Sequence, residues 1–142
     1  MYNEKFEIFW VDISKDHLFL VNELLLESEV QVEIKYFSSY DRVIENLKIK
    51  APRLIVSNYC LQKGSELLLK RPEEMDHRNV YWLYDEVKKL YSEQDFIYYS
   101  TMIDSHTKLD TVKKCLAEIP LISKHEPSLM AEAIKKLVIK TI

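Results

Sequence analysis

Five short apolar runs alternate along this sequence with longer segments of helical periodicity, and no other feature restricts the possible folds as strongly. The runs are Phe6–Val11, Val30–Tyr36, Leu54–Ser57, Phe96–Ser100 and Ile119–Ser123. Their length and their β-branched and aromatic content indicate strands. Strands that alternate with helices form a parallel sheet with helices on both faces. The sequence therefore predicts an α/β fold with a doubly wound, five-stranded parallel sheet.

The ends of several elements are also marked in the sequence. The run VQVEIKY alternates apolar and polar residues, which predicts a half-exposed strand at a sheet edge. Ser14 is expected to cap the first helix, Ser38 or Ser39 the second, and the last helix is expected to begin near Pro127. We expect one domain over residues 1–142, with an insertion or broken helix near 72–93.

Composition excludes several classes of function. The single glycine, Gly64, is too few for the glycine-rich loops of Rossmann and P-loop nucleotide sites. The net charge of −3 includes no long block of like charges, so neither nucleic acid nor membrane is expected as a partner.

No signal peptide and no membrane-spanning run is found, which favours the cytoplasm. The two cysteines and four histidines lack metal-ligand spacing, so no metal or other cofactor is expected.

Four polar residues stand where strands of the predicted sheet end. Asp12 follows the first strand, Asn58 the third and Lys124 the fifth, while Ser100 ends the fourth. Functional residues of open α/β sheets gather at the carboxyl ends of the strands. These four residues are therefore the candidate site.

The order of these residues resembles the receiver domain of bacterial two-component response regulators. In that family the first strand ends in an acidic pair that holds magnesium, the third in the phosphoacceptor aspartate, the fourth in Ser or Thr, and the fifth in Lys. The stretch APRLIVSNYCLQKGSELL is similar to the family's phosphoacceptor region and puts Asn58 at the acceptor position. The resemblance spans essentially the whole chain. It implies the flavodoxin-like strand order 2-1-3-4-5.

The departures from the family pattern bear directly on chemistry. Phosphoryl transfer to a side chain of this kind needs a carboxylate nucleophile and a divalent cation. Asn58 is a neutral amide, and Ile13 replaces the second member of the acidic pair. The resemblance thus implies a degenerate phosphoacceptor site of Asp12, Ile13, Asn58, Ser100 and Lys124, with no catalytic residue and no metal. Lys124 is expected to form a salt bridge with Asp12 across the strand ends.

The resulting prediction is a phosphorylation-independent pseudo-receiver, not an enzyme, that signals through protein association. It would act as a homodimer or as a docking module for another protein. The resemblance implies a contact face on the last two helices and the fifth strand, which includes Lys108, Lys113, Leu116 and Lys135.

Two alternatives stay open. One is a small α/β hydrolase or transferase that uses Asp12, Ser100 and Lys124, although the sequence offers no glycine-rich oxyanion loop. The other is that this chain is the N-terminal piece of a longer regulator.

Overall fold

The computed structural model describes residues 5–12, 14–58, 82–100 and 120–140. Within them lies a five-stranded parallel sheet in the order β2-β1-β3-β4-β5, as predicted. The strands are β1 (Phe6–Val11), β2 (Val32–Phe37), β3 (Leu54–Ser57), β4 (Asp95–Ser100) and β5 (Leu121–Ser123). The doubly wound, flavodoxin-like fold class is confirmed.

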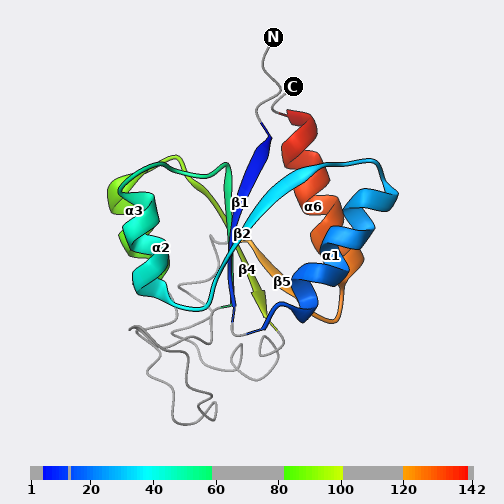
Figure 1. The fold of residues 1–142 in the computed structure, drawn as a ribbon, viewed down its shortest axis with the longest axis horizontal. Helices are drawn as coiled ribbons and strands as arrows, with labels where there is room; N and C mark the ends of the chain where they lie inside the picture. The colour runs from blue at the N-terminus through cyan, green and yellow to red at the C-terminus, as the bar shows by residue number, and fades with distance from the viewer. Residues whose placement is uncertain (1–4, 13, 59–81, 101–119, 141–142) are drawn as a thin grey trace.

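Helices cover both faces of the sheet (Figure 1). The described helices are α1 (Asp16–Glu27), α2 (Tyr40–Leu47), α3 (Trp82–Leu90) and α6 (Pro127–Lys140). α1 and α6 pack side by side on one face, and α2 and α3 lie together on the other. Two buried clusters result, because successive side chains of each strand point to opposite faces.

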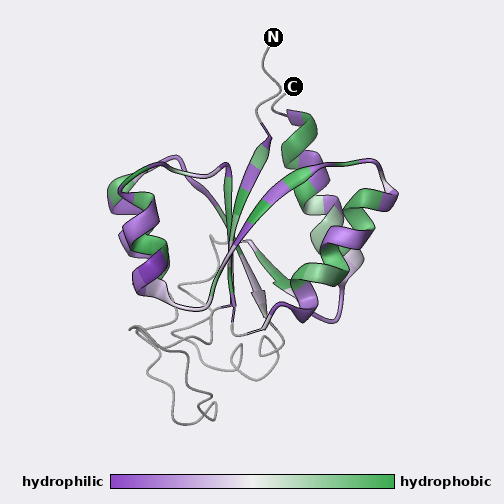
Figure 2. Cartoon of the chain, in the orientation of Figure 1, coloured by the Kyte–Doolittle hydropathy of each residue, from purple (hydrophilic) through white to green (hydrophobic). Residues whose placement is uncertain are grey.

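Strand burial follows the sequence pattern. The central strand β3 is buried at all four positions, as expected for an apolar run covered on both faces. β2 alternates half-buried and exposed residues and lies at the sheet edge, which confirms the prediction for VQVEIKY. Figure 2 shows the same alternation of hydrophobic and hydrophilic residues along β2.

The helix starts agree only in part with the predicted caps. The hydroxyl of Ser14 accepts a hydrogen bond from the backbone N–H of Asp16 (3.1 Å), so it supports the first turn of α1. Ser39 occupies the N-cap position of α2, but its buried Oγ has no hydrogen-bond partner among the described residues. α6 begins at Pro127, as predicted.

Four strand ends differ from the predictions, since β2 also extends to Phe37 and β4 begins one residue early, at Asp95. β2 begins at Val32 rather than Val30, because the backbone N–H of Val30 bonds to Leu25 and completes the turn after α1. β5 begins at Leu121; Pro120 has no N–H for the ladder, although its carbonyl still accepts from the N–H of Tyr98.

The insertion or broken helix expected near 72–93 lies partly outside the described residues. Of that range the structure describes residues 82–93, which include α3. The prediction of one domain with an insertion stays a prediction. None of the helices in the described ranges is long and apolar enough to cross a membrane.

Candidate functional site

Three of the predicted residues come together where the strands end. Asp12, Asn58 and Lys124 follow β1, β3 and β5, and they are only 1%, 7% and 7% exposed. The N–H of Asp12 bonds to the carbonyl of Phe37 (3.0 Å), and the N–H of Asn58 bonds to that of Val11 (2.9 Å). The ladder thus continues past the last strand residues and fixes the backbone from which the side chains of Asp12 and Asn58 extend.

The carboxylate of Asp12 is the centre of this cluster. Its Oδ1 accepts a hydrogen bond from Nδ2 of Asn58 at 3.3 Å. Its Oδ2 forms an ion pair with the ammonium of Lys124. The salt bridge expected between Asp12 and Lys124 is therefore present. We refer to Asp12, Asn58 and Lys124 below as the strand-end cluster.

Three further side chains surround the cluster, and sequence reasoning missed them. The Tyr36 hydroxyl donates to the carbonyl oxygen of Asp12 at 2.7 Å. Tyr99, in β4, packs edge-on against Trp10 and lies 6.1 Å from the His17 ring, centroid to centroid. Tyr36 and Tyr99 each lie at or beside the end of a predicted strand, and that position was the available signal. His17 is the second residue of α1, and no comparable signal marked it in the sequence.

These neighbours are titratable groups in a site of low polarity. Burial raises the pKa of the Tyr99 hydroxyl to about 12, and the carboxylate of Asp12 adds to the rise. The same two causes raise the pKa of Tyr36. Burial lowers the pKa of His17 below 6.5, with a further decrease from Lys124 and an opposing effect of Asp12. The environment thus favours neutral forms around one buried ion pair.

Magnesium, the cation implied by the resemblance, does not fit the residues that are present. It needs near-octahedral oxygen coordination, usually with one or two carboxylates. Both oxygens of the Asp12 carboxylate are already engaged, one by an amide N–H and the other by an ammonium. The described residues also contain no group of three or more His, Cys, Asp or Glu side chains suited to a metal. The ammonium of Lys124 compensates the charge of the Asp12 carboxylate in this arrangement.

The remaining predicted residues are placed less completely. Ser100 ends β4 opposite Ser123 of β5, but its side chain lies outside the described part of the structure. Ile13, Lys108, Lys113 and Leu116 also lie outside the described residues. Lys135 lies on α6, is half-buried and does not belong to the strand-end cluster.

The strand-end cluster offers neither a nucleophile nor a base at Asn58 and Lys124. An amide nitrogen that donates to a carboxylate is not a nucleophile, and an ion-paired ammonium has no lone pair with which to accept a proton. The contacts of Asp12 with Asn58 and Lys124 hold the ends of β1, β3 and β5 together.

Comparison with known proteins agrees with this fold. No family model and no curated protein matches the sequence. Among solved structures, the chain is similar to the response regulator protein TrrA from Thermotoga maritima in complex with Mg²⁺-BeF, with a TM-score of 0.62 and 16% identity over 94% of this chain and 99% of that one. It is also similar to the signal receiver domain of an HD domain-containing protein from Pseudomonas fluorescens, with a TM-score of 0.64 and 18% identity over 95% of each chain.

TrrA has also been solved in complex with the histidine kinase ThkA, and in that structure it matches with a TM-score of 0.63 and 17% identity over 94% of this chain and 98% of that one. Identities this low establish the fold alone. The chain has the fold of response regulator receiver domains.

Proposed function

We propose that this chain is a pseudo-receiver, a signalling domain that is not phosphorylated and that acts by binding another protein or a second copy of itself. The observation that carries the proposal is the amide of Asn58, which follows β3 and donates to the buried carboxylate of Asp12. A receiver fold combined with a neutral amide at this position supports signalling without phosphoryl transfer.

The residue after β3 supports the proposal first, because it is not a nucleophile. A phosphoacceptor must offer an anionic oxygen, and the neutral amide of Asn58 offers none. Its Nδ2–H is directed at Asp12, so the carboxylate is the acceptor of this contact rather than a free ligand.

The ion pair of Lys124 supports the proposal as well. Incoming phosphoryl oxygens need positive charge, yet the charge of Lys124 is already compensated by Asp12. Releasing Lys124 would leave the Asp12 carboxylate, 1% exposed, without its counter-charge. The cluster therefore favours one fixed arrangement over two exchangeable ones.

The partner in this proposal is a protein. TrrA forms a complex with a histidine kinase, which supports a protein-binding role for this fold. We place the contact face on α6, β5 and the segment that carries Lys108, Lys113 and Leu116, with Lys135 on α6 as its described member.

The enzymatic alternative has less support. A serine–lysine mechanism requires a neutral lysine to accept the serine proton. Lys124 is instead an ammonium in a buried ion pair with Asp12, so it is not available as a base.

The decisive experiment is to treat the protein with acetyl phosphate and magnesium and to measure its intact mass. The wild type is expected to gain no phosphoryl group. The variants Asn58→Asp and Asn58→Asp with Ile13→Asp restore the acceptor and then the acidic pair, and phosphorylation is expected in the double variant. A phosphorylated wild type would overturn the proposal.

Association is tested separately by light scattering and by pull-down. A homodimer, or a stable complex with one partner that Lys135→Glu weakens, is expected. A strictly monomeric protein that retains no partner would contradict the protein-binding half of the proposal.

A further inference from the structure

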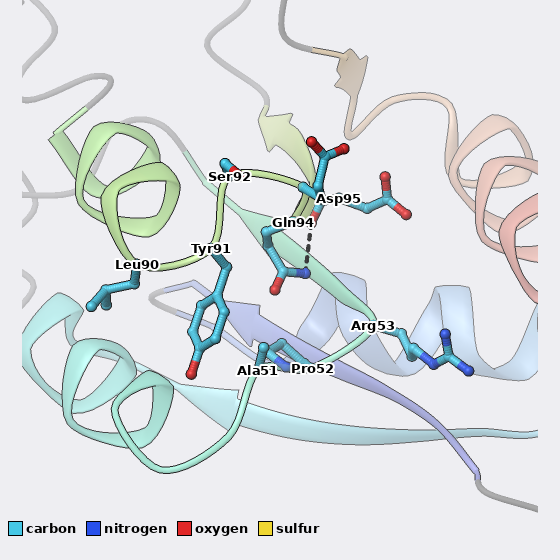
Figure 3. Close-up of a pocket in the computed structure, with 9 residues that line it drawn as sticks. Ala51, Pro52, Arg53, Leu90, Tyr91, Ser92, Gln94 and Asp95 are labelled. Carbon is cyan, nitrogen blue, oxygen red and sulfur yellow. Dashed lines mark hydrogen bonds between the residues drawn. The ribbon is translucent and has the colours of Figure 1, made fainter.

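A surface hollow lies at the amino ends of β3 and β4, at the opposite end of the sheet from the strand-end cluster. Figure 3 shows the residues that line it. Residues 51–53, which lead into β3, form one wall, and residues 90–95, which join α3 to β4, form the other. Its volume is about 510 Å³, large enough for a small metabolite. All of its lining residues are described.

The segment from α3 to β4 is held by its own hydrogen bonds. The ammonium of Lys88 donates to the carbonyl oxygens of Ser92 (3.3 Å) and Gln94 (2.6 Å). The Tyr91 hydroxyl donates to the carbonyl of Leu47 at the end of α2, which fixes its ring at the wall of the hollow. A wall that is ordered without a ligand loses little conformational entropy on binding.

Gln94 presents an unused acceptor to this hollow. The residue is only 6% exposed, and its Nε2 donates to the carbonyl of Asp95 at 3.1 Å, which sets the orientation of the amide. The amide oxygen Oε1 accepts no hydrogen bond from any described residue, and Figure 3 shows it on the side of Tyr91 and Ala51. Oε1 is not among the buried side-chain atoms that lack a hydrogen-bond partner, so it reaches solvent in the hollow. A ligand N–H would take the place of that water.

Charges of both signs lie at the same hollow. Arg53 supplies a guanidinium, and Glu93 and Asp95 supply carboxylates. Arg53 directly precedes Leu54, the first residue of β3, and Leu54 pairs with Asp95 of β4 in the sheet register. Arg53 and Asp95 are therefore neighbours at the start of adjacent strands. None of the three forms an ion pair within the described part of the chain. Arg53 and Asp95 extend on one side of the hollow, with Tyr91 and Leu90 on the other (Figure 3).

From this geometry we infer that the hollow binds a free α-amino acid with an apolar side chain. The ligand's ammonium would donate to Oε1 of Gln94 and to the carboxylate of Asp95 or Glu93. Its carboxylate would pair with Arg53, whose guanidinium suits bidentate binding of a carboxylate. The apolar side chain would lie against the Tyr91 ring and Leu90.

The charge balance selects this class over simpler ions. An anion without an amine would face the two carboxylates of Glu93 and Asp95. An amine without a carboxylate would bring a second cation beside Arg53. A zwitterion matches both signs at once.

The test is a titration of ¹⁵N-labelled protein with L-leucine, followed by the backbone amide signals. Saturable shifts are expected at Ala51, Arg53 and residues 92–95, with a Kd of about 1 mM or tighter. Leucinamide, which lacks the carboxylate, and N-acetyl-leucine, which lacks the ammonium, are expected to bind at least about tenfold more weakly.

Substitutions at two exposed residues complete the experiment. Arg53→Gln is expected to abolish the L-leucine shifts, whereas Lys50→Gln, its exposed neighbour, leaves them unchanged. Shifts with L-leucine that do not saturate, an equal response to N-acetyl-leucine, or shifts that map elsewhere would overturn the inference. None of these outcomes depends on phosphorylation, so the test is independent of the proposed function.

Discussion

The ammonium of Lys124 pairs with the carboxylate of Asp12, from which it is separated by 112 positions in the sequence. β1 and β5 are not neighbours in the sheet, since β3 and β4 lie between them. The ion pair therefore crosses the carboxyl edge of the sheet. Both side chains are almost fully buried, so each charge depends on the other for compensation.

Replacing Lys124 with methionine is expected to destabilise the protein strongly, because the buried Asp12 carboxylate then loses the ammonium that pairs with it. The expected loss in the free energy of unfolding is about 3–5 kcal/mol, measured by urea denaturation. The exposed Lys136→Met on α6 is the control and should change stability by less than about 0.5 kcal/mol. The double variant Asp12→Leu with Lys124→Met should recover most of the loss. Equal effects of Lys124→Met and Lys136→Met would show that the ion pair is not important to stability.

Asn58→Asp is expected to make stability depend on pH in a defined direction. The new carboxylate would stand beside Asp12, where the amide donates at 3.3 Å, so repulsion raises the pKa of one of the two carboxyl groups. A raised carboxyl pKa gives stability that is present at low pH and is lost as the pH rises through that pKa.

The variant should therefore be less stable than the wild type at neutral pH, and the difference should shrink towards about pH 4. Thermal melts over this range measure it. The exposed amide-to-acid change Gln31→Glu is the control and should show no comparable gap. A constant difference across the pH range would contradict the expected repulsion.

Tyr99→Phe is expected to leave stability unchanged or to increase it. The Tyr99 hydroxyl is buried without a hydrogen-bond partner among the described residues, so its removal costs no hydrogen bond within that part of the chain. The folded pKa is raised from 10.0 to about 12, which means that this group's contribution is full below pH 10 and is lost as the pH rises through about 12. The variant should resist alkaline unfolding better than the wild type, as followed by circular dichroism. Greater alkaline sensitivity would contradict it.

His17→Gln is expected to flatten the acid side of the stability profile. The charged groups that face His17 are Lys124, Asp12, Asp16 and His125, and burial with Lys124 keeps its pKa below 6.5. A lowered histidine pKa gives stability that is present above 6.5 and is lost as the pH falls through the folded value. The stability of the wild type relative to the variant should therefore fall as the pH drops from 6.5 to the folded pKa, and the difference should stay constant below that value. Parallel profiles would mean that His17 titrates as an exposed histidine does.

The sequence predicted the elements of this fold well because burial on each strand and helix is a local pattern. LIVS is apolar at three successive positions and becomes the buried strand β3, while VQVEIKY alternates and becomes the edge strand β2. Boundaries were less certain. Val30 has the composition of a strand residue, yet its N–H bonds to Leu25 at the end of α1, a contact that local pattern does not encode.

The strand-end residues were likewise predictable as a set, because parallel strands bring their carboxyl ends to one edge. Chemistry available from the sequence also establishes that Asn58 is an amide and that Lys124 carries a charge. The salt bridge between Lys124 and Asp12 was also expected, but the hydrogen bond from Asn58 to the same carboxylate was not. That contact depends on side-chain directions, which are set by packing between segments 46 positions apart.

By itself the sequence determined the order and type of the elements and the residues that follow each strand, since periodicity and residue identity act locally. Only the tertiary structure decided that Asn58 joins Lys124 at the carboxylate of Asp12, that the Tyr99 hydroxyl is buried with no hydrogen-bond partner among the described residues, and that Gln94 faces a charged hollow at the far end of the sheet. Each of these depends on contacts between distant segments, whose geometry is fixed when the helices pack on the sheet.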